Sequence, residues 1–116
     1  MKKGNIILEK TLAFSVRMLK LAEFLESKKQ RIIADQILRC GMSVGANIAE
    51  SDYAASKADF INKLKIAEKE AGETAYWLRV LKAGAIIDEK QFESLFSDID
   101  EIQCLIGASI KTLKNN

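Results

Sequence analysis

Apolar residues recur along this chain in alternating steps of three and four, the spacing of helices that each bury one stripe of side chains. The first stripe covers residues 5–27, and the second follows a short polar segment and ends near residue 50. The third runs from residue 60 to 81 without a break, and the fourth from 92 to 113. The sequence therefore predicts four α-helices.

The four stripes also predict which residues face the core. They are Leu8, Leu12, Ser15, Leu19 and Ala22 in the first helix; Ile33, Ile37, Cys40 and Val44 in the second; Phe60, Leu64, Ala67, Ala71, Thr74, Leu78 and Leu81 in the third; and Phe92, Leu95, Ile99, Ile102, Ile106, Ser109 and Leu113 in the fourth. Capping residues agree with these bounds: Ser51, Asp52 and Ser56 can cap a helix end before the third stripe, Gly84 follows that stripe, and Asp88 with Gln91 forms a capping pair before the fourth.

Helices of about 20 residues that are joined by short connections must run antiparallel to their neighbours. We therefore expect an all-α fold, an antiparallel up-down-up-down four-helix bundle that forms a single domain over residues 1–116. Two glycines four residues apart, Gly41 and Gly45, indicate a close approach of a neighbouring helix to the second one; the alternative is a flexible hinge or a ligand groove.

Composition limits the chemistry that such a bundle can perform. The 116 residues include no His, so the usual general base and the commonest metal ligand are both missing. Cys40 and Cys104 lie singly among apolar residues, and we expect both to be reduced core residues. We accordingly expect no enzyme activity, no metal and no cofactor. Neither a signal peptide nor an 18-residue apolar span is evident, so a cytoplasmic location is expected.

Helices two and three carry a family resemblance. The segment QILRCGMSVGANIAE at residues 36–50, together with segments 56–60, 64–67 and 70–78, resembles the bacterial four helix bundle proteins known as 23S ribosomal RNA intervening sequence proteins. That family is similar in fold to the accessory variability determinant of diversity-generating retroelements, a pentameric barrel of four-helix bundles that binds nucleic acid and a reverse transcriptase. The resemblance implies a homo-oligomer, a pentamer, and makes RNA or DNA a candidate partner; it supplies no catalytic mechanism.

A polar row lies on one face of the second helix, and two glutamates in the third helix are level with its middle. We interpret it either as an interhelical network in which Arg39 or Asn47 meets Glu70 or Glu73, or as a ligand or oligomer contact. The candidate residues are Gln36, Arg39, Ser43, Asn47, Glu50, Glu70 and Glu73.

Positive charge gathers in the first helix. Residues 1–31 carry eight positive and three negative charges, whereas the remainder carries ten positive and thirteen negative. Lys3, Lys10, Arg17 and Lys20 are the candidate contacts to nucleic-acid phosphates, which an oligomer would multiply. The alternative is an ordinary solvated face.

Two aromatic residues complete the candidates. Tyr76 and Trp77 are expected at an oligomer interface, although Trp77 fits equally well as a residue packed around the core. Two functions follow: a non-enzymatic, oligomeric nucleic-acid-binding accessory module that acts through the basic first helix, or an oligomeric scaffold or protein-interaction module without nucleic-acid binding.

Overall fold

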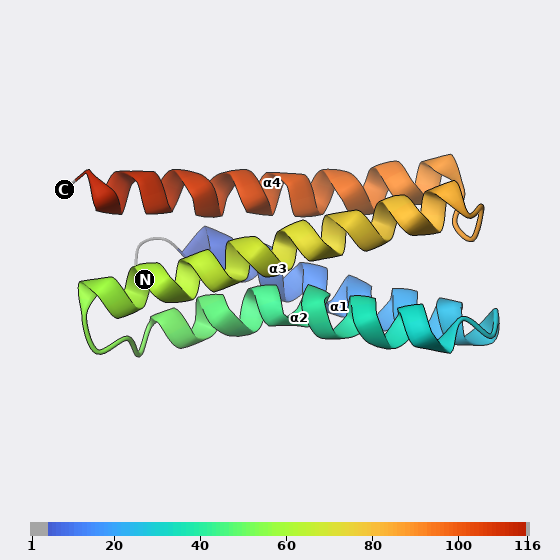
Figure 1. The fold of residues 1–116 in the computed structure, drawn as a ribbon, viewed down its shortest axis with the longest axis horizontal. Coiled ribbons are helices and arrows are strands. Elements are labelled where there is room, and N and C mark those ends of the chain that lie inside the picture. Colours follow the sequence, from blue (N-terminus) through green and yellow to red (C-terminus); the bar gives the residue numbers. More distant parts are fainter. Residues whose placement is uncertain (1–4, 116) are drawn as a thin grey trace.

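The computed structural model describes residues 5–115 and contains four α-helices in up-down-up-down order (Figure 1). Their bounds are α1 Asn5–Ser27, α2 Arg31–Ser51, α3 Lys57–Ala83 and α4 Glu89–Lys114. No strand occurs in this part of the chain. The predicted fold class and the predicted helices are confirmed.

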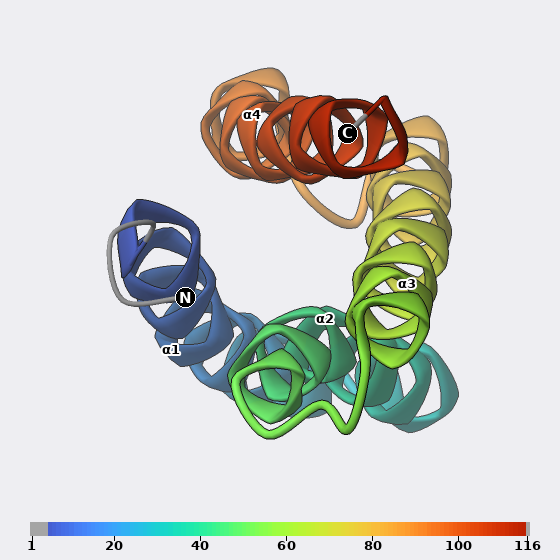
Figure 2. The ribbon, with the colours of Figure 1, turned by 90° about the vertical axis from the view of Figure 1, so that its left-hand side faces the viewer.

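The helices follow one another around a square when the bundle is seen end-on (Figure 2). Each helix packs closely against the next one in sequence, but the last seam, between α1 and α4, is the most open and has the fewest contacts. The α1–α2 seam and the α3–α4 seam consequently lie on opposite sides of the bundle.

Side chains close the helix ends as the sequence predicts. The Ser56 hydroxyl accepts a hydrogen bond from the Asp59 amide at 3.0 Å, and the Asp88 carboxylate accepts one from the Gln91 amide at 2.7 Å. The Gln91 side chain accepts the Asp88 amide in return, at 2.9 Å, which completes a capping box. These caps satisfy amides that would otherwise lack partners and so fix where α3 and α4 begin.

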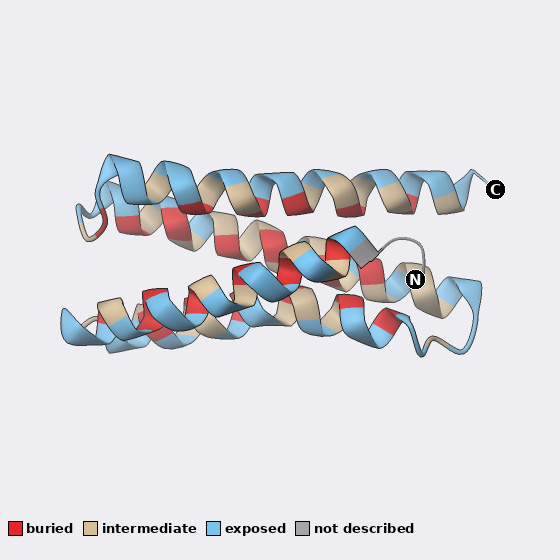
Figure 3. Cartoon of the chain, turned by 180° about the vertical axis from the view of Figure 1, so that it is seen from behind, coloured by how far each residue is buried: buried red, intermediate tan, exposed pale blue. Residues whose placement is uncertain are grey.

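The core is built from stripes that turn inward on all four helices (Figure 3). In α2, α3 and α4 the buried positions are largely those that the spacing predicts, with Phe60, Phe92 and Leu113 at the half-buried edges. Ile33 and Ser109 are also half-buried. Three-and-four spacing therefore identifies the core face of these helices correctly.

The predicted stripe of α1 is wrong by about one position. Leu12 and Leu19 are 65% and 46% exposed, and the buried residues are instead Ile7, Thr11, Phe14, Met18, Leu21, Ala22 and Leu25. Both stripes have helical spacing, and the buried stripe contains a threonine, so the predicted stripe looks the more apolar of the two by sequence. The Thr11 hydroxyl donates to the Leu8 carbonyl at 2.9 Å, which satisfies it in the core.

Gly41 lies where α2 comes closest to α1. A Cβ on Gly41 would lie 2.6 Å from the Met18 Cγ, and a Cβ on Gly45 would lie 3.2 Å from the Thr11 Cβ. Because real Cβ atoms do not approach other heavy atoms as closely as 2.6 Å, a side chain at Gly41 would separate α1 from α2 or displace the Met18 side chain. The predicted close approach is confirmed.

Candidate functional site

A group of exposed apolar side chains straddles the seam between α1 and α2. Leu12, Val16 and Leu19 of α1 are 65%, 49% and 46% exposed, and Met42 of α2 is 36% exposed. The exposed alanines Ala46 and Ala49 of α2 complete a set that we call the α1–α2 surface: Leu12, Val16, Leu19, Met42, Ala46 and Ala49.

Helix geometry places the two halves of this surface side by side. Gly45 contacts the side chains of Thr11 and Ser15, so this edge of α2 faces the Ser15 edge of α1. Leu12 and Leu19 flank Ser15 by three and four residues and share its side of α1. Met42 and Ala49 lie just outside Gly41 and Gly45 on α2, and the apolar surface is therefore continuous across the seam.

The basic row of α1 is engaged with α4. Arg17 bonds to the Asp98 carboxylate at 2.6 Å and to the Ser94 carbonyl and hydroxyl, and the Lys10 ammonium pairs with Glu101 at 3.2 Å. Lys20 approaches Glu23 at 4.0 Å, and the fourth predicted residue, Lys3, lies outside the described residues. Lys10 and Arg17 thus tie α1 to α4, and their charge is partly neutralised there.

The polar row of α2 does face α3, but with different pairings from those expected. Glu50 pairs with Lys63 of α3 at 3.0 Å, and the Asn47 amide donates to the Ser43 carbonyl within α2. Arg39 is exposed and, within residues 5–115, pairs with neither Glu70 nor Glu73. Its charge is therefore exposed to solvent.

The remaining members of the predicted network have local roles. Gln36 and Ser43 are half-buried, and the Glu70 carbonyl accepts the Thr74 hydroxyl at 2.8 Å. The Glu73 carboxylate accepts the Trp77 indole N–H at 3.1 Å. These contacts hold α3 and do not assemble an acid and a base around a common cleft.

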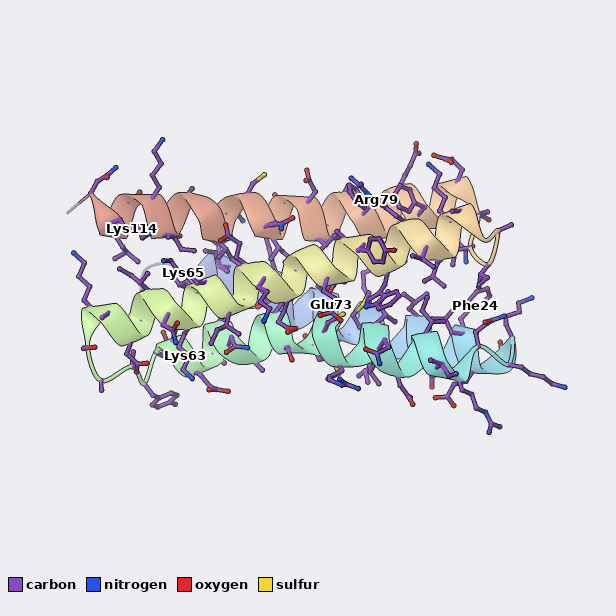
Figure 4. All side chains as sticks on the ribbon, viewed as in Figure 1. Phe24, Lys63, Lys65, Glu73, Arg79 and Lys114 are labelled. Atoms are coloured by element: carbon purple, nitrogen blue, oxygen red, sulfur yellow. The ribbon has the colours of Figure 1, made fainter. Side chains whose placement is uncertain are left out.

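Tyr76 and Trp77 lie edge to face with ring centroids 5.5 Å apart, but their environments differ. Trp77 is half-buried and packs against the core, whereas Tyr76 is 60% exposed. Glu73, the partner of Trp77, lies on the α2 side of α3, and Arg79 lies on the α4 side (Figure 4). One interpretation of Trp77, packing around the core, is confirmed.

The two cysteines have opposite environments. Cys40 is buried, accepts the Thr74 hydroxyl at 3.2 Å, and burial raises the pKa of its thiol to about 11. Cys104 is exposed, so its predicted place in the core is wrong. It occupies the outer face of α4 because the buried stripe runs through Ile102 and Ile106 instead.

We expect a water-soluble thiol reagent at pH 8 to modify one of the two cysteines in the folded protein, Cys104. Cys40 lacks both access and thiolate at this pH, since its pKa is about 11. Counting modified thiols by mass spectrometry with and without denaturant checks this result. Cys104→Ser should leave no thiol that reacts before unfolding, and rapid modification of that variant would show that Cys40 is accessible.

Two further properties concern the described part of the chain. None of its helices combines the length and apolarity needed to cross a membrane. Between residues 5 and 115, no three His, Cys, Asp or Glu side chains come together in a group that could hold a metal ion.

The α1–α2 surface was missed by sequence reasoning because its leucines were assigned to the core. The sequence signal for this surface is the presence of two apolar stripes on one helix. The helix of residues 5–27 has enough apolar residues for two faces, whereas a helix in a bundle needs only one to face the core. The second face then points to a further contact.

Comparison with known proteins relates this bundle to one family. The family model of the 23S rRNA-intervening sequence protein matches residues 3–108. A crystal structure from Bacteroides thetaiotaomicron VPI-5482, of a protein with unknown function from the S23 ribosomal protein family, is 47% identical, with a TM-score of 0.89. The match covers 90% of this chain and 98% of that one, and no curated protein gives a significant match. The chain belongs to the 23S rRNA-intervening sequence protein family.

Proposed function

We propose that this chain is a non-catalytic module whose copies associate through the α1–α2 surface. The observation that carries the proposal is the continuous exposed apolar surface at Leu12, Val16, Leu19 and Met42. A contiguous apolar patch on an isolated chain marks an interaction site more often than a solvated face. The small residues Ala46 and Ala49 would let a partner helix come close.

A second copy is the occupant that the chain itself favours. The α1–α2 surface carries no charged side chain among its members, so a highly charged partner has nothing to pair with there, whereas an apolar face of a neighbouring copy can cover it. The resemblance to a pentameric assembly supports a closed ring of five copies. A ring requires that each copy contact two neighbours, through the α1–α2 surface and a second face.

Catalysis has little support in the chemistry of the chain. There is no His in the sequence, and the Glu73 carboxylate accepts the Trp77 indole N–H within its own helix. General acid and base groups need a shared substrate site between them. An interaction module therefore accounts for the arrangement better than an enzyme.

Replacing Leu12 and Val16 together by Glu should reduce the mass of the assembly toward that of one chain, because the surface would then bury two unpaired charges. Sedimentation velocity at micromolar concentration measures the effect. Ile32→Glu is the matched control, since Ile32 is an 83% exposed apolar residue of α2 outside the surface. An unchanged mass for Leu12→Glu/Val16→Glu would show that copies do not meet at this surface.

A second candidate is nucleic-acid binding through charge, and the basic turn between α1 and α2 favours it. Lys28, Lys29 and Arg31 are exposed there, and none of them forms an ion pair with another described residue. The Lys28 ammonium lies over the Phe24 ring, 5.5 Å from its centroid. Free cations of this kind contact phosphates rather than bases, as Lys3, Lys10, Arg17 and Lys20 are also predicted to do.

If charge drives such binding, affinity for a fully paired RNA duplex should fall steeply as salt rises and should not depend on sequence. A gel-shift salt series measures both properties. Lys28→Glu with Lys29→Glu should weaken binding at every sequence, while Lys57→Glu at the other end of the bundle serves as the control. Equal affinity of the two charge-reversed variants would exclude the turn as the binding surface.

A further inference from the structure

The outer face of the α3–α4 seam combines aromatic rings with cations at residues that self-association through α1–α2 does not use. The Arg79 guanidinium, on the α4 side of α3 (Figure 4), lies 5.5 Å above the Phe96 ring, and the Lys82 ammonium lies 4.5 Å above the Phe92 ring. Phe92 and Phe96 stack at 5.0 Å, and Tyr76 is 60% exposed beside them. Alternating rings and positive charges are the elements with which proteins bind unpaired nucleotides.

A groove of about 290 Å³ opens at the middle of this seam. Its walls include Tyr76 and Arg79 from α3 and Phe96, Asp100 and Gln103 from α4. Within residues 5–115, no hydrogen bond or ion pair is formed by the side chains of Arg79, Asp100 or Gln103. A cation, a carboxylate and an amide thus converge on one groove without satisfying one another, as in sites that bind a polar ring.

Gly72 lies against the amide side of the groove. A Cβ at Gly72 would lie 3.4 Å from the Gln103 Nε2, an ordinary van der Waals distance, so the backbone of α3 comes close to this amide. The Gln103 side chain is half-buried, which limits its motion, and it lines the groove together with Gly72.

We infer that this groove binds the base of an unpaired guanine nucleotide. Guanine is the base whose Watson–Crick edge offers two adjacent donors, and the two oxygens of the Asp100 carboxylate can accept both, while the Gln103 amide donates to its carbonyl oxygen. The exposed Tyr76 ring provides a stacking face, and Arg79 is placed to neutralise the nucleotide phosphate. The ligand is either a free guanine nucleotide or a guanine within single-stranded RNA.

A second pair of cations extends the seam. Lys65 and Lys114 lie next to each other where α3 and α4 meet at the far end, and this contact between two ammonium groups lowers the pKa of Lys65 (Figure 4). Like charges held together attract an anion. Lys65 precedes Tyr76 by eleven residues, about 16 Å along the helix. A single RNA strand whose guanine stacks on Tyr76 could therefore place another of its phosphates beside Lys65 and Lys114.

The only tryptophan of the chain makes the site measurable, since Trp77 lies 5.5 Å from Tyr76. In one arm, guanosine monophosphate is titrated against the full chain and compared with adenosine monophosphate by Trp77 fluorescence. In the other, fluorescence anisotropy compares octamers of uridine that carry one central guanine or one central adenine. We expect guanine to bind at least about tenfold more tightly than adenine in one or both arms. The arm that shows this preference identifies the ligand as a free nucleotide or as a guanine within single-stranded RNA.

Two variants and one control decide whether the groove is responsible. Asp100→Asn should abolish the preference for guanine, because the amide no longer accepts two donors, and Tyr76→Ala should weaken binding by at least about fivefold. Tyr53→Ala removes a tyrosine outside the groove that is 89% exposed, so it should change neither the preference for guanine nor the affinity. Circular dichroism confirms that each variant is folded. Equal affinity for guanine and adenine in both arms, or an unchanged preference in Asp100→Asn, overturns the inference. Sedimentation tests the association of copies separately, so the two proposals fail independently.

Discussion

Phe14→Ala should lower the free energy of unfolding by about 3 to 5 kcal/mol, the usual cost of removing a buried phenyl ring and leaving a cavity. Phe14 is 1% exposed and lies at the centre of the buried stripe of α1. Since a domain of this size is stable by about 5 to 15 kcal/mol, the variant would be close to unfolding. Urea denaturation followed by circular dichroism, at one fixed protein concentration, measures the change.

Leu12→Ala is the control for this experiment because it truncates a residue of the other apolar stripe. Leu12 is 65% exposed within the chain, so its loss should cost less than about 1 kcal/mol in a single molecule. A larger effect of Leu12→Ala than of Phe14→Ala would reverse the assignment of the two stripes. A protein in which both changes are costly and concentration-dependent would indicate that the α1–α2 surface is buried between copies.

Gly41→Val is the second change with a large expected effect, a loss of about 3 kcal/mol or more. A Cβ at this position would lie 2.6 Å from the Met18 Cγ and 2.7 Å from its Sδ, and Met18 is completely buried. The valine must therefore separate α1 from α2 or displace a core side chain, and overpacking of this kind is destabilising. Thermal unfolding of the variant provides the measurement.

Gly107→Val supplies a matched change on α4. A Cβ there would meet only the end of the flexible Glu68 side chain, at 3.2 Å, so this variant should stay within about 1 kcal/mol of the natural protein. If both valine variants unfold at the same temperature, the close contact between α1 and α2 does not require a glycine at position 41.

The sequence alone predicts the fold well where a helix has one apolar face. In α3, a stripe from Leu64 to Leu81 is opposed by charged residues, and every position of it is buried. The prediction of the buried face fails in α1, which has two apolar stripes, because the exposed stripe contains more leucines than the buried one. Only the packing of Phe14 and Met18 against the other helices shows which stripe is buried.

The candidate surfaces could be predicted only in part, because they depend on the register between helices. Spacing places Lys10 and Arg17 on one face of α1, but it does not show that Glu101 and Asp98 of α4 face them. In the same way, Tyr76 and Arg79 are evident on α3, yet the groove exists because Asp100 and Gln103 of α4 lie opposite. Such pairings join residues that are distant in sequence, and no local pattern encodes them.

The most direct test of self-association is the mass of the natural protein in solution, measured by light scattering at micromolar concentration. One chain has a mass of 12.9 kDa. Association through the α1–α2 surface predicts a stable multiple of this value, fivefold for the closed ring that the family resemblance implies. A mass of 12.9 kDa across the micromolar range would contradict the proposal, because the exposed Leu12, Val16 and Leu19 would then remain in water.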